Sequence, residues 1–192
     1  MIHRMIYPNK CIFCQKALDD KNAHDCCHGG KAPYPYGDAT RGPVHRLKYG
    51  GVRTLAVPMA KAMVRGISSW KQPPYGAIPL IVPVPLHSER EKERGFNQAK
   101  LLALEIYKLT KFPMMDGLTR PRNTAPQHGL TPDERAANLE GAIAVKPDFD
   151  PANRHILLVD DIYTTGATSA ACIAALTTAG AISIEVIVFA KV

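Results

Sequence analysis

The sequence lacks a long uninterrupted apolar segment. Its longest apolar runs, residues 77–86 and 186–190, contain prolines or are too short to cross a bilayer. The first ten residues, MIHRMIYPNK, have neither the apolar stretch nor the small-residue cleavage site of a secretory signal. We therefore expect no membrane insertion and a cytoplasmic location.

Acidic and aromatic residues are both scarce. Aromatic residues make up 7% of the 192 residues, and 17 acidic side chains stand against 24 lysines and arginines, which gives a net charge of +7. The basic excess favours a polyanionic ligand, either nucleic acid or a multiply phosphorylated small molecule, although it also serves solubility. A hydrophobic content of 46% is ordinary for a globular protein, so the composition gives no sign of extensive disorder.

Cysteine is nearly absent from most of the chain, since four of the five cysteines lie within the first 27 residues. This segment ends at the turn-forming residues Gly29 and Gly30. We therefore predict a small zinc ribbon-like module over residues 1–32 and a main domain over residues 33–192. The fifth cysteine, Cys172, lies in an alanine-rich predicted helix and is interpreted as core packing.

Two pairs of potential zinc ligands occur in the N-terminal segment, each pair separated by two residues. The four candidates are Cys11, Cys14, His24 and Cys27. Their spacing is typical of a tetrahedral structural zinc site. Cys26 and His28 are competing candidates for the fourth ligand. Because adjacent residues of an extended segment point in opposite directions, Cys26 is the alternative to Cys27. Disulfides are disfavoured in a reducing compartment.

Apolar periodicity predicts the secondary structure of the main domain. Helices are predicted over residues 53–70, 97–109 and 167–178, and strands over residues 78–84, 155–159 and 182–189. Polar or proline-rich composition predicts loops over residues 87–94 and 120–135, the second of them exposed and mobile. Strand, helix and strand follow one another at the spacing of a parallel crossover. We therefore expect an α/β fold with a mostly parallel sheet flanked by helices.

The segment ILLVDDIYTTGAT, residues 156–168, carries the most specific chemical pattern. An apolar strand leads to Asp160 and Asp161, and hydroxyl side chains, Gly166 and successive backbone N–H groups then open a helix, which makes a cradle for an anion. Carboxylates suit the vicinal hydroxyls of a ribose, directly or through a water of a bound magnesium ion. The alternative is an ordinary strand-to-helix corner with acids as N-caps, which explains one acid but not both.

This pattern resembles the phosphoribosyl pyrophosphate (PRPP) motif of the phosphoribosyltransferase family. The resemblance implies that PRPP is the ligand and that Asp160 and Asp161 hold the ribose hydroxyls at the catalytic centre. The residues that it implies for the 5-phosphate are Thr164, Thr165, Gly166, Ala167 and Thr168. Ala167 departs mildly from the family, which usually has a second Gly or Thr there. The hypoxanthine-guanine enzymes have an Asp at the position of Thr164, which argues against purine salvage.

A second set of motifs extends along nearly the whole chain. It comprises LKY at 47–49, VPVP at 82–85, RGFNQ at 94–98, Gln127, Arg135, Asn138 and the N-terminal cysteines. In this order the motifs resemble the competence protein F (ComF) family, in which a zinc-binding N-terminus precedes a phosphoribosyltransferase domain. The resemblance implies a role in DNA uptake during natural transformation. A competence helicase, single-stranded DNA and a second copy of the chain are the candidate partners.

The pyrophosphate of PRPP requires basic side chains, and arginine forks are the natural partners. Arg94 is favoured by its place in the family motif, and Arg90 and Lys48 are further candidates. Each of these residues has an alternative interpretation without a ligand. Arg90 and Arg94 can belong to a solvated charged segment, and Lys48 can be a surface lysine. Gln127 and Arg135 resemble family residues of a loop that closes over ligand.

Two functions remain open from the sequence. An enzyme would displace pyrophosphate from the anomeric carbon through a cationic transition state stabilised by nearby carboxylates, with magnesium on the leaving group. A non-catalytic adaptor would sense PRPP and bind a competence helicase or single-stranded DNA. The sequence carries no motif that identifies an acceptor for the ribosyl group.

Overall fold

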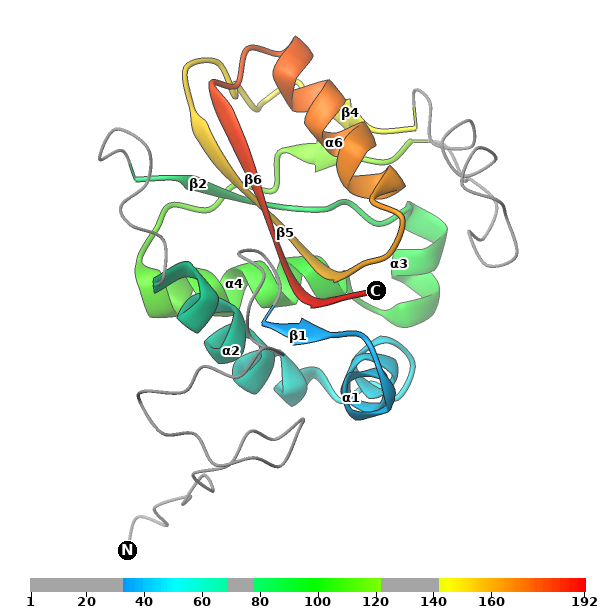
Figure 1. Cartoon of the computed structure of the whole chain (residues 1–192). Coiled ribbons are helices and arrows are strands. Elements are labelled where there is room, and N and C mark those ends of the chain that lie inside the picture. The colour runs from blue at the N-terminus through cyan, green and yellow to red at the C-terminus, as the bar shows by residue number, and fades with distance from the viewer. Residues whose placement is uncertain (1–32, 69–77, 122–141) are drawn as a thin grey trace, which may run out of the picture.

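The structure, a computed structural model, describes residues 33–68, 78–121 and 142–192 (Figure 1). The predicted zinc module, with its four candidate ligands and the alternatives Cys26 and His28, lies outside the described residues, as do Gln127 and Arg135. The elements are β1 (Tyr34–Pro35), α1 (Asp38–Lys48), η2 (Arg53–Leu55), α2 (Ala56–Ser68), β2 (Leu80–Pro83), α3 (Ser88–Arg94), α4 (Gln98–Thr110), β3 (Leu118–Thr119), β4 (Ala144–Val145), β5 (His155–Tyr163), α6 (Ala167–Thr178) and β6 (Ser183–Lys191).

A four-stranded sheet in the order β1-β6-β5-β2 forms the centre of the fold, and every pairing in it is parallel. Helices α2 and α4 lie on one side of this sheet and α6 on the other (Figure 1). The expected α/β class, with a parallel sheet flanked by helices, is confirmed. Among the described residues no helix has the length and apolar character needed to span a membrane.

Both faces of β5 are buried, which explains its continuous apolar run. Leu157 and Val159 pack into the cluster formed with α2 and α4, whereas Ile156 and Leu158 pack into the cluster formed with α6. Alternate residues of a strand point to opposite faces, so one short segment supplies both cores. This double burial fixes the strand that leads to the two acids.

The predicted helix over residues 167–178 is confirmed at both ends, and the predicted strand over 182–189 corresponds to β6. The loop predicted over residues 87–94 is wrong, because Ser88–Arg94 forms α3. His87 caps this helix by accepting a hydrogen bond from the Glu89 backbone N–H, and Gly95 closes it in a left-handed conformation. The segment SEREKER has no apolar stripe, so periodicity could not reveal the helix.

The exposed loop predicted over residues 120–135 is wrong at its first residue. The side chain of Arg120 is buried, with 7% of its surface exposed. It directly follows β3, which pairs with β4 in an antiparallel two-stranded sheet. Residues 122–135 lie outside the described part of the chain.

Gly117 offers a test of packing at the base of this small sheet. A Cβ atom added to Gly117 would lie 2.0 Å from Cδ1 of the buried Phe149 ring. We expect Gly117→Ala to displace the ring and to lower the free energy of unfolding by about 1–3 kcal/mol, the usual cost of overpacking. Urea denaturation checks this. Gly42→Ala is the control, since a Cβ there meets nothing within 4 Å and alanine is favourable inside a helix, and equal stability of the two variants would contradict the packing.

Candidate functional site

Asp160 and Asp161 lie within β5 rather than after it. The strand continues to Tyr163, and its last residues pair with β6 in the register Asp160↔Val188, Ile162↔Ala190 and Tyr163↔Lys191. Both carboxylates are therefore held on regular backbone, and both are buried, with 9% of Asp160 and 2% of Asp161 exposed. Buried carboxylates require compensating charges or hydrogen bonds.

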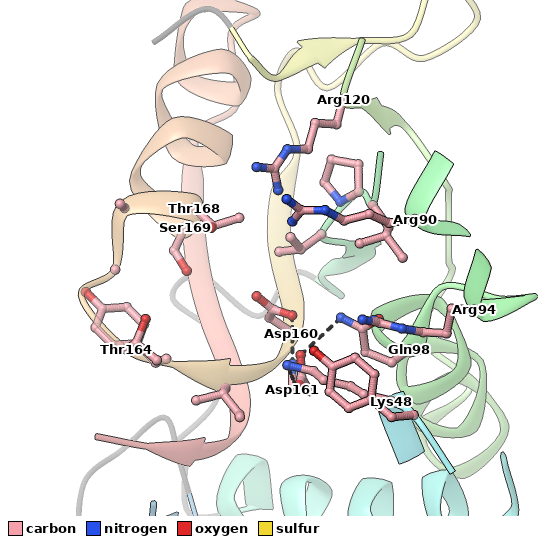
Figure 2. Close-up of a pocket in the computed structure, with 18 residues that line it drawn as sticks. Lys48, Arg90, Arg94, Gln98, Arg120, Asp160, Asp161, Thr164, Thr168 and Ser169 are labelled. Atoms are coloured by element: carbon pink, nitrogen blue, oxygen red, sulfur yellow. Dashed lines mark hydrogen bonds and ion pairs between the residues drawn. The ribbon is translucent and has the colours of Figure 1, made fainter. Parts of the chain in front are cut away.

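A cavity of about 390 Å³ opens at this end of the sheet. Figure 2 shows its polar side chains facing one another, with the two acids between the start of α6 and the side chains of Lys48, Arg94 and Gln98. The labelled lining residues are Lys48, Arg90, Arg94, Gln98, Arg120, Asp160, Asp161, Thr164, Thr168 and Ser169. A cavity of this size is suited to a small-molecule ligand.

A chain of polar contacts holds Asp161. The ammonium Nζ of Lys48 lies 2.6 Å from Oδ2 of Asp161, and Nε2 of Gln98 donates to Oδ1 at 3.2 Å. Arg94 in turn donates to the side-chain oxygen of Gln98. Asp160 accepts a hydrogen bond of 2.8 Å from the Asp161 backbone N–H. One acid is thus paired with a cation, while the other is held through the backbone.

The two acids differ in pKa because only one has a cation in contact. Burial raises the pKa of Asp160 well above its usual value, and the neighbouring charge of Asp161 raises it further. Burial also acts to raise the pKa of Asp161, but the charge and hydrogen bonds of Lys48 outweigh it, so this pKa is lowered. Burial alone would lower the pKa of Lys48, yet Asp161 raises it above its ordinary value. The ion pair is therefore charged at neutral pH.

The start of α6 leaves its N-terminus open to a ligand. Gly166 is the N-cap, with φ of +79°, and no side chain caps the helix. The alternative in which the acids serve as N-caps of this helix is therefore wrong. A Cβ at Gly166 would lie 2.2 Å from Oη of Tyr163, so both the positive φ and the packed ring require glycine here.

The predicted phosphate residues do not all face the cavity. Thr164, Gly166, Ala167 and Thr168 line it, whereas Thr165 is exposed and is not among its lining residues. The predicted Arg94 also lines it.

The polar lining residues that sequence reasoning did not assign to the site include Gln98 in its role between Arg94 and Asp161, Arg120, Tyr163 and Ser169. Gln98 is part of the RGFNQ motif, and Ser169 directly follows the hydroxyl-rich run; both were weak signals for the site.

Among the described residues no group of three or more His, Cys, Asp or Glu side chains is arranged to hold a metal ion. The two acids present only oxygen donors to the cavity, a donor set that fits the hard cation Mg²⁺ through its water shell. Zinc would need softer or more numerous ligands than this pair provides. The donor set of the described acids is therefore of the kind that suits magnesium rather than zinc.

No protein-family model matches the chain. Solved structures similar to it include UMP synthase from Leishmania donovani, at 14% identity and a TM-score of 0.45, covering 77% of this chain and 24% of that one. A substrate complex of hypoxanthine phosphoribosyltransferase from Trypanosoma cruzi shows 18% identity and a TM-score of 0.40, covering 72% and 66%. Both likenesses are loose, and the α/β class of the fold rests on the parallel sheet and flanking helices of this chain.

The sequence relatives are more specific. Competence protein F from Haemophilus influenzae is 38% identical over 91 residues, which cover 46% of this chain and 39% of that protein. The DNA utilization protein YhgH from Escherichia coli is 30% identical over 145 residues, covering 74% and 63%. Competence protein ComFC from Bacillus subtilis is 31% identical over 138 residues, covering 72% and 53%. The chain is a homologue of these proteins, as its motifs predicted, and it spans less than two thirds of their length.

The different environments of the acids predict opposite effects of two similar substitutions. Because the pKa of Asp160 is raised on folding, its ionisation destabilises the folded state as pH rises above the usual carboxyl range. We expect Asp160→Asn to raise the melting temperature at pH 7, and the gain to vanish in acid, where Asp160 is protonated in both states.

Asp161→Asn should instead destabilise the protein. Because the pKa of Asp161 is lowered on folding, its ionisation stabilises the folded state at pH values above the pKa of the unfolded chain. This stabilisation is lost as the pH falls through the folded-state pKa. Without this carboxylate Lys48 is left in a largely buried site, at a cost of roughly 1–3 kcal/mol. Thermal melts of both variants across pH 3 to 8, roughly the range of carboxyl titration, measure this; shifts in the same direction at pH 7 would contradict the assignment.

Proposed function

We propose that this protein binds PRPP together with Mg²⁺ and acts as a phosphoribosyltransferase-like protein in DNA uptake during natural transformation. The observation that carries the proposal is the shared cavity of the buried acid pair and the uncapped N-terminus of α6. A sugar phosphate requires these two features side by side, because its hydroxyls need acceptors and its phosphate needs donors.

The 5-phosphate would bind at the start of α6. The backbone N–H groups of this first turn receive no side-chain cap, and the hydroxyls of Thr164 and Thr168 lie at the same wall of the cavity. The helix dipole adds a favourable partial charge. Asp160 and Asp161 would then meet the ribose hydroxyls, with the sugar lying across the end of β5.

Basic side chains on the opposite wall would hold the pyrophosphate. Arg90, Arg94 and Arg120 line the cavity across from α6 (Figure 2). Guanidinium groups bind phosphate oxygens through paired hydrogen bonds. Bound Mg²⁺ would neutralise the pyrophosphate and orient it as a leaving group. These arginines are drawn from α3 and from the residue after β3, so the site combines distant parts of the chain.

As an enzyme, the protein would transfer the ribosyl group by displacement of pyrophosphate. Positive charge develops on the sugar in such a reaction, and an ionised carboxylate beside the ring would stabilise it. Asp161 is the acid that stays ionised, because Lys48 lowers its pKa. The role in DNA uptake is proposed from the relatives, whose names refer to competence and to DNA utilization.

Titration calorimetry with PRPP and Mg²⁺ tests the binding site. We expect wild type to bind and Asp160→Asn to lose at least about tenfold in affinity, since bound Mg²⁺ would favour the ionised form of Asp160 and a hydrogen bond to a charged group is worth about 1.5–3 kcal/mol. This variant is chosen because it keeps the Lys48–Asp161 ion pair. Asp148→Asn is the matched control, because Asp148 is exposed and lies outside the cavity lining. Equal binding by wild type and Asp160→Asn would refute the site.

Pyrophosphate release that depends on an added acceptor distinguishes the enzyme from a PRPP-sensing protein.

A second candidate function, an adaptor for single-stranded DNA and a competence helicase, is favoured by the outer face of α1. Arg41, His45 and Arg46 are exposed on this helix, and the ring of Tyr49 follows with 68% of its surface exposed. The ring centroids of His45 and Tyr49 lie 4.9 Å apart, with the two planes tilted by 48°. Basic groups beside an exposed ring match the needs of a strand that offers phosphates and unpaired bases.

Salt-dependent binding to a single-stranded oligonucleotide tests this surface. We expect Arg46→Gln to weaken binding and to reduce the slope of log affinity against log salt by about one, as the loss of one phosphate contact requires. Arg154→Gln carries the same charge change on an exposed residue at the start of β5 and should bind as wild type does. Identical salt slopes for wild type and Arg46→Gln would remove α1 from the interface.

A further inference from the structure

We infer that Lys48 is the resident cation of the acid pair: its ammonium occupies the position of a divalent cation in the ligand-free protein, so that the metal enters only with its phosphorylated ligand. The inference rests on the proposed use of the acid pair, and it adds a cation-selecting role for a residue outside the phosphate motif. The Lys48–Asp161 contact of 2.6 Å carries it.

The acid pair has a strong need for positive charge. Two carboxylates follow one another in β5, and both are buried. The described contacts supply a single ammonium, from Lys48, and the neutral amide of Gln98. The attraction of the pair for a cation is large because water screens charges poorly in a buried site. Without Lys48 the site would be left with two acids and no cation in contact.

The backbone of Lys48 is fixed while its side chain is adjustable. Lys48 is the last residue of α1, and the preceding Leu47 is fully buried in the core. After the helix, Gly50 and Gly51 form the turn, with Gly51 at a φ of +65°. A lysine side chain has four rotatable methylene groups and carries a compact point charge. The ammonium can therefore leave Asp161 without any movement of the helix.

Arg94 cannot replace Lys48 as the counter-ion in the same way. Its guanidinium donates to Gln98 and lies 5.2 Å from the centre of the Tyr49 ring. Gln98 separates it from Asp161, to which the amide donates. The positive charge of Arg94 opposes that of Lys48, which favours release of the ammonium once another cation reaches the acids.

A competition between cations follows. A free divalent ion must shed part of its hydration shell and displace an ammonium that already has a partner, so it binds weakly alone. An ion delivered on a phosphorylated ligand brings extra contacts at the start of α6 and with the arginines. The displaced ammonium then has ligand phosphate oxygens within the same cavity as new partners. Lys48 thus makes metal uptake conditional on ligand.

Binding of Mn²⁺ alone, measured by electron paramagnetic resonance, tests the inference without any use of PRPP. We expect Lys48→Met to bind Mn²⁺ at least tenfold more tightly than wild type, and Lys48→Arg to behave as wild type because it keeps the charge. Adding Asp160→Asn to Lys48→Met should abolish the gain, which locates the ion at the acid pair. Unchanged Mn²⁺ affinity in Lys48→Met would overturn the inference.

Lys108→Met is the matched control. Lys108 pairs with Glu105 at 2.7 Å on the exposed surface of α4, so its removal exposes a carboxylate away from the cavity and should add no tight Mn²⁺ site. Should Lys48→Met be unstable, its melting temperature with and without Mn²⁺ gives the answer, since a tighter site raises it more than in wild type. A gain in Mn²⁺ affinity without any binding of PRPP by wild type would uphold the inference and refute the proposed ligand.

Discussion

Two carboxylates buried side by side at the end of a parallel strand need a counter-charge, and the ion pair between Lys48 and Asp161 supplies it. This contact joins the end of α1 to β5, a helix and a strand that lie far apart in the sequence. It orients Asp161, lowers its pKa and leaves Asp160 as the acid with the raised pKa. The two acids therefore differ in charge and in contacts because only Asp161 is paired with Lys48.

The double-sided core makes this arrangement possible. β5 is packed on both faces, so its backbone cannot shift to expose the acids to solvent. Only three residues separate the strand from the helix that follows, and the last of them, Gly166, turns the chain through its left-handed conformation. The uncapped start of α6 and the two acids are consequently set by one continuous segment, while the basic side chains of the cavity come from elsewhere in the chain.

Local pattern was sufficient to predict β5, α6 and β6, because buried parallel strands and an alanine-rich helix carry strong periodic signals. Helix α1 was not predicted, since Gly42 and Pro43 lie within it and its exposed side is basic. The Lys48–Asp161 pair joins residues 113 positions apart, and no local rule connects them. Arg120 was assigned to a loop on composition, although its guanidinium is buried beside the cavity.

Cys172 lies on the side of α6 that packs against the sheet, with none of its surface exposed. Burial raises the pKa of its thiol far above the usual value, so the reactive thiolate is suppressed in the folded protein. An alkylating reagent can reach this sulfur only when α6 moves away from the sheet. The labelling rate of the peptide that contains Cys172 therefore measures how often α6 separates from the sheet by local unfolding.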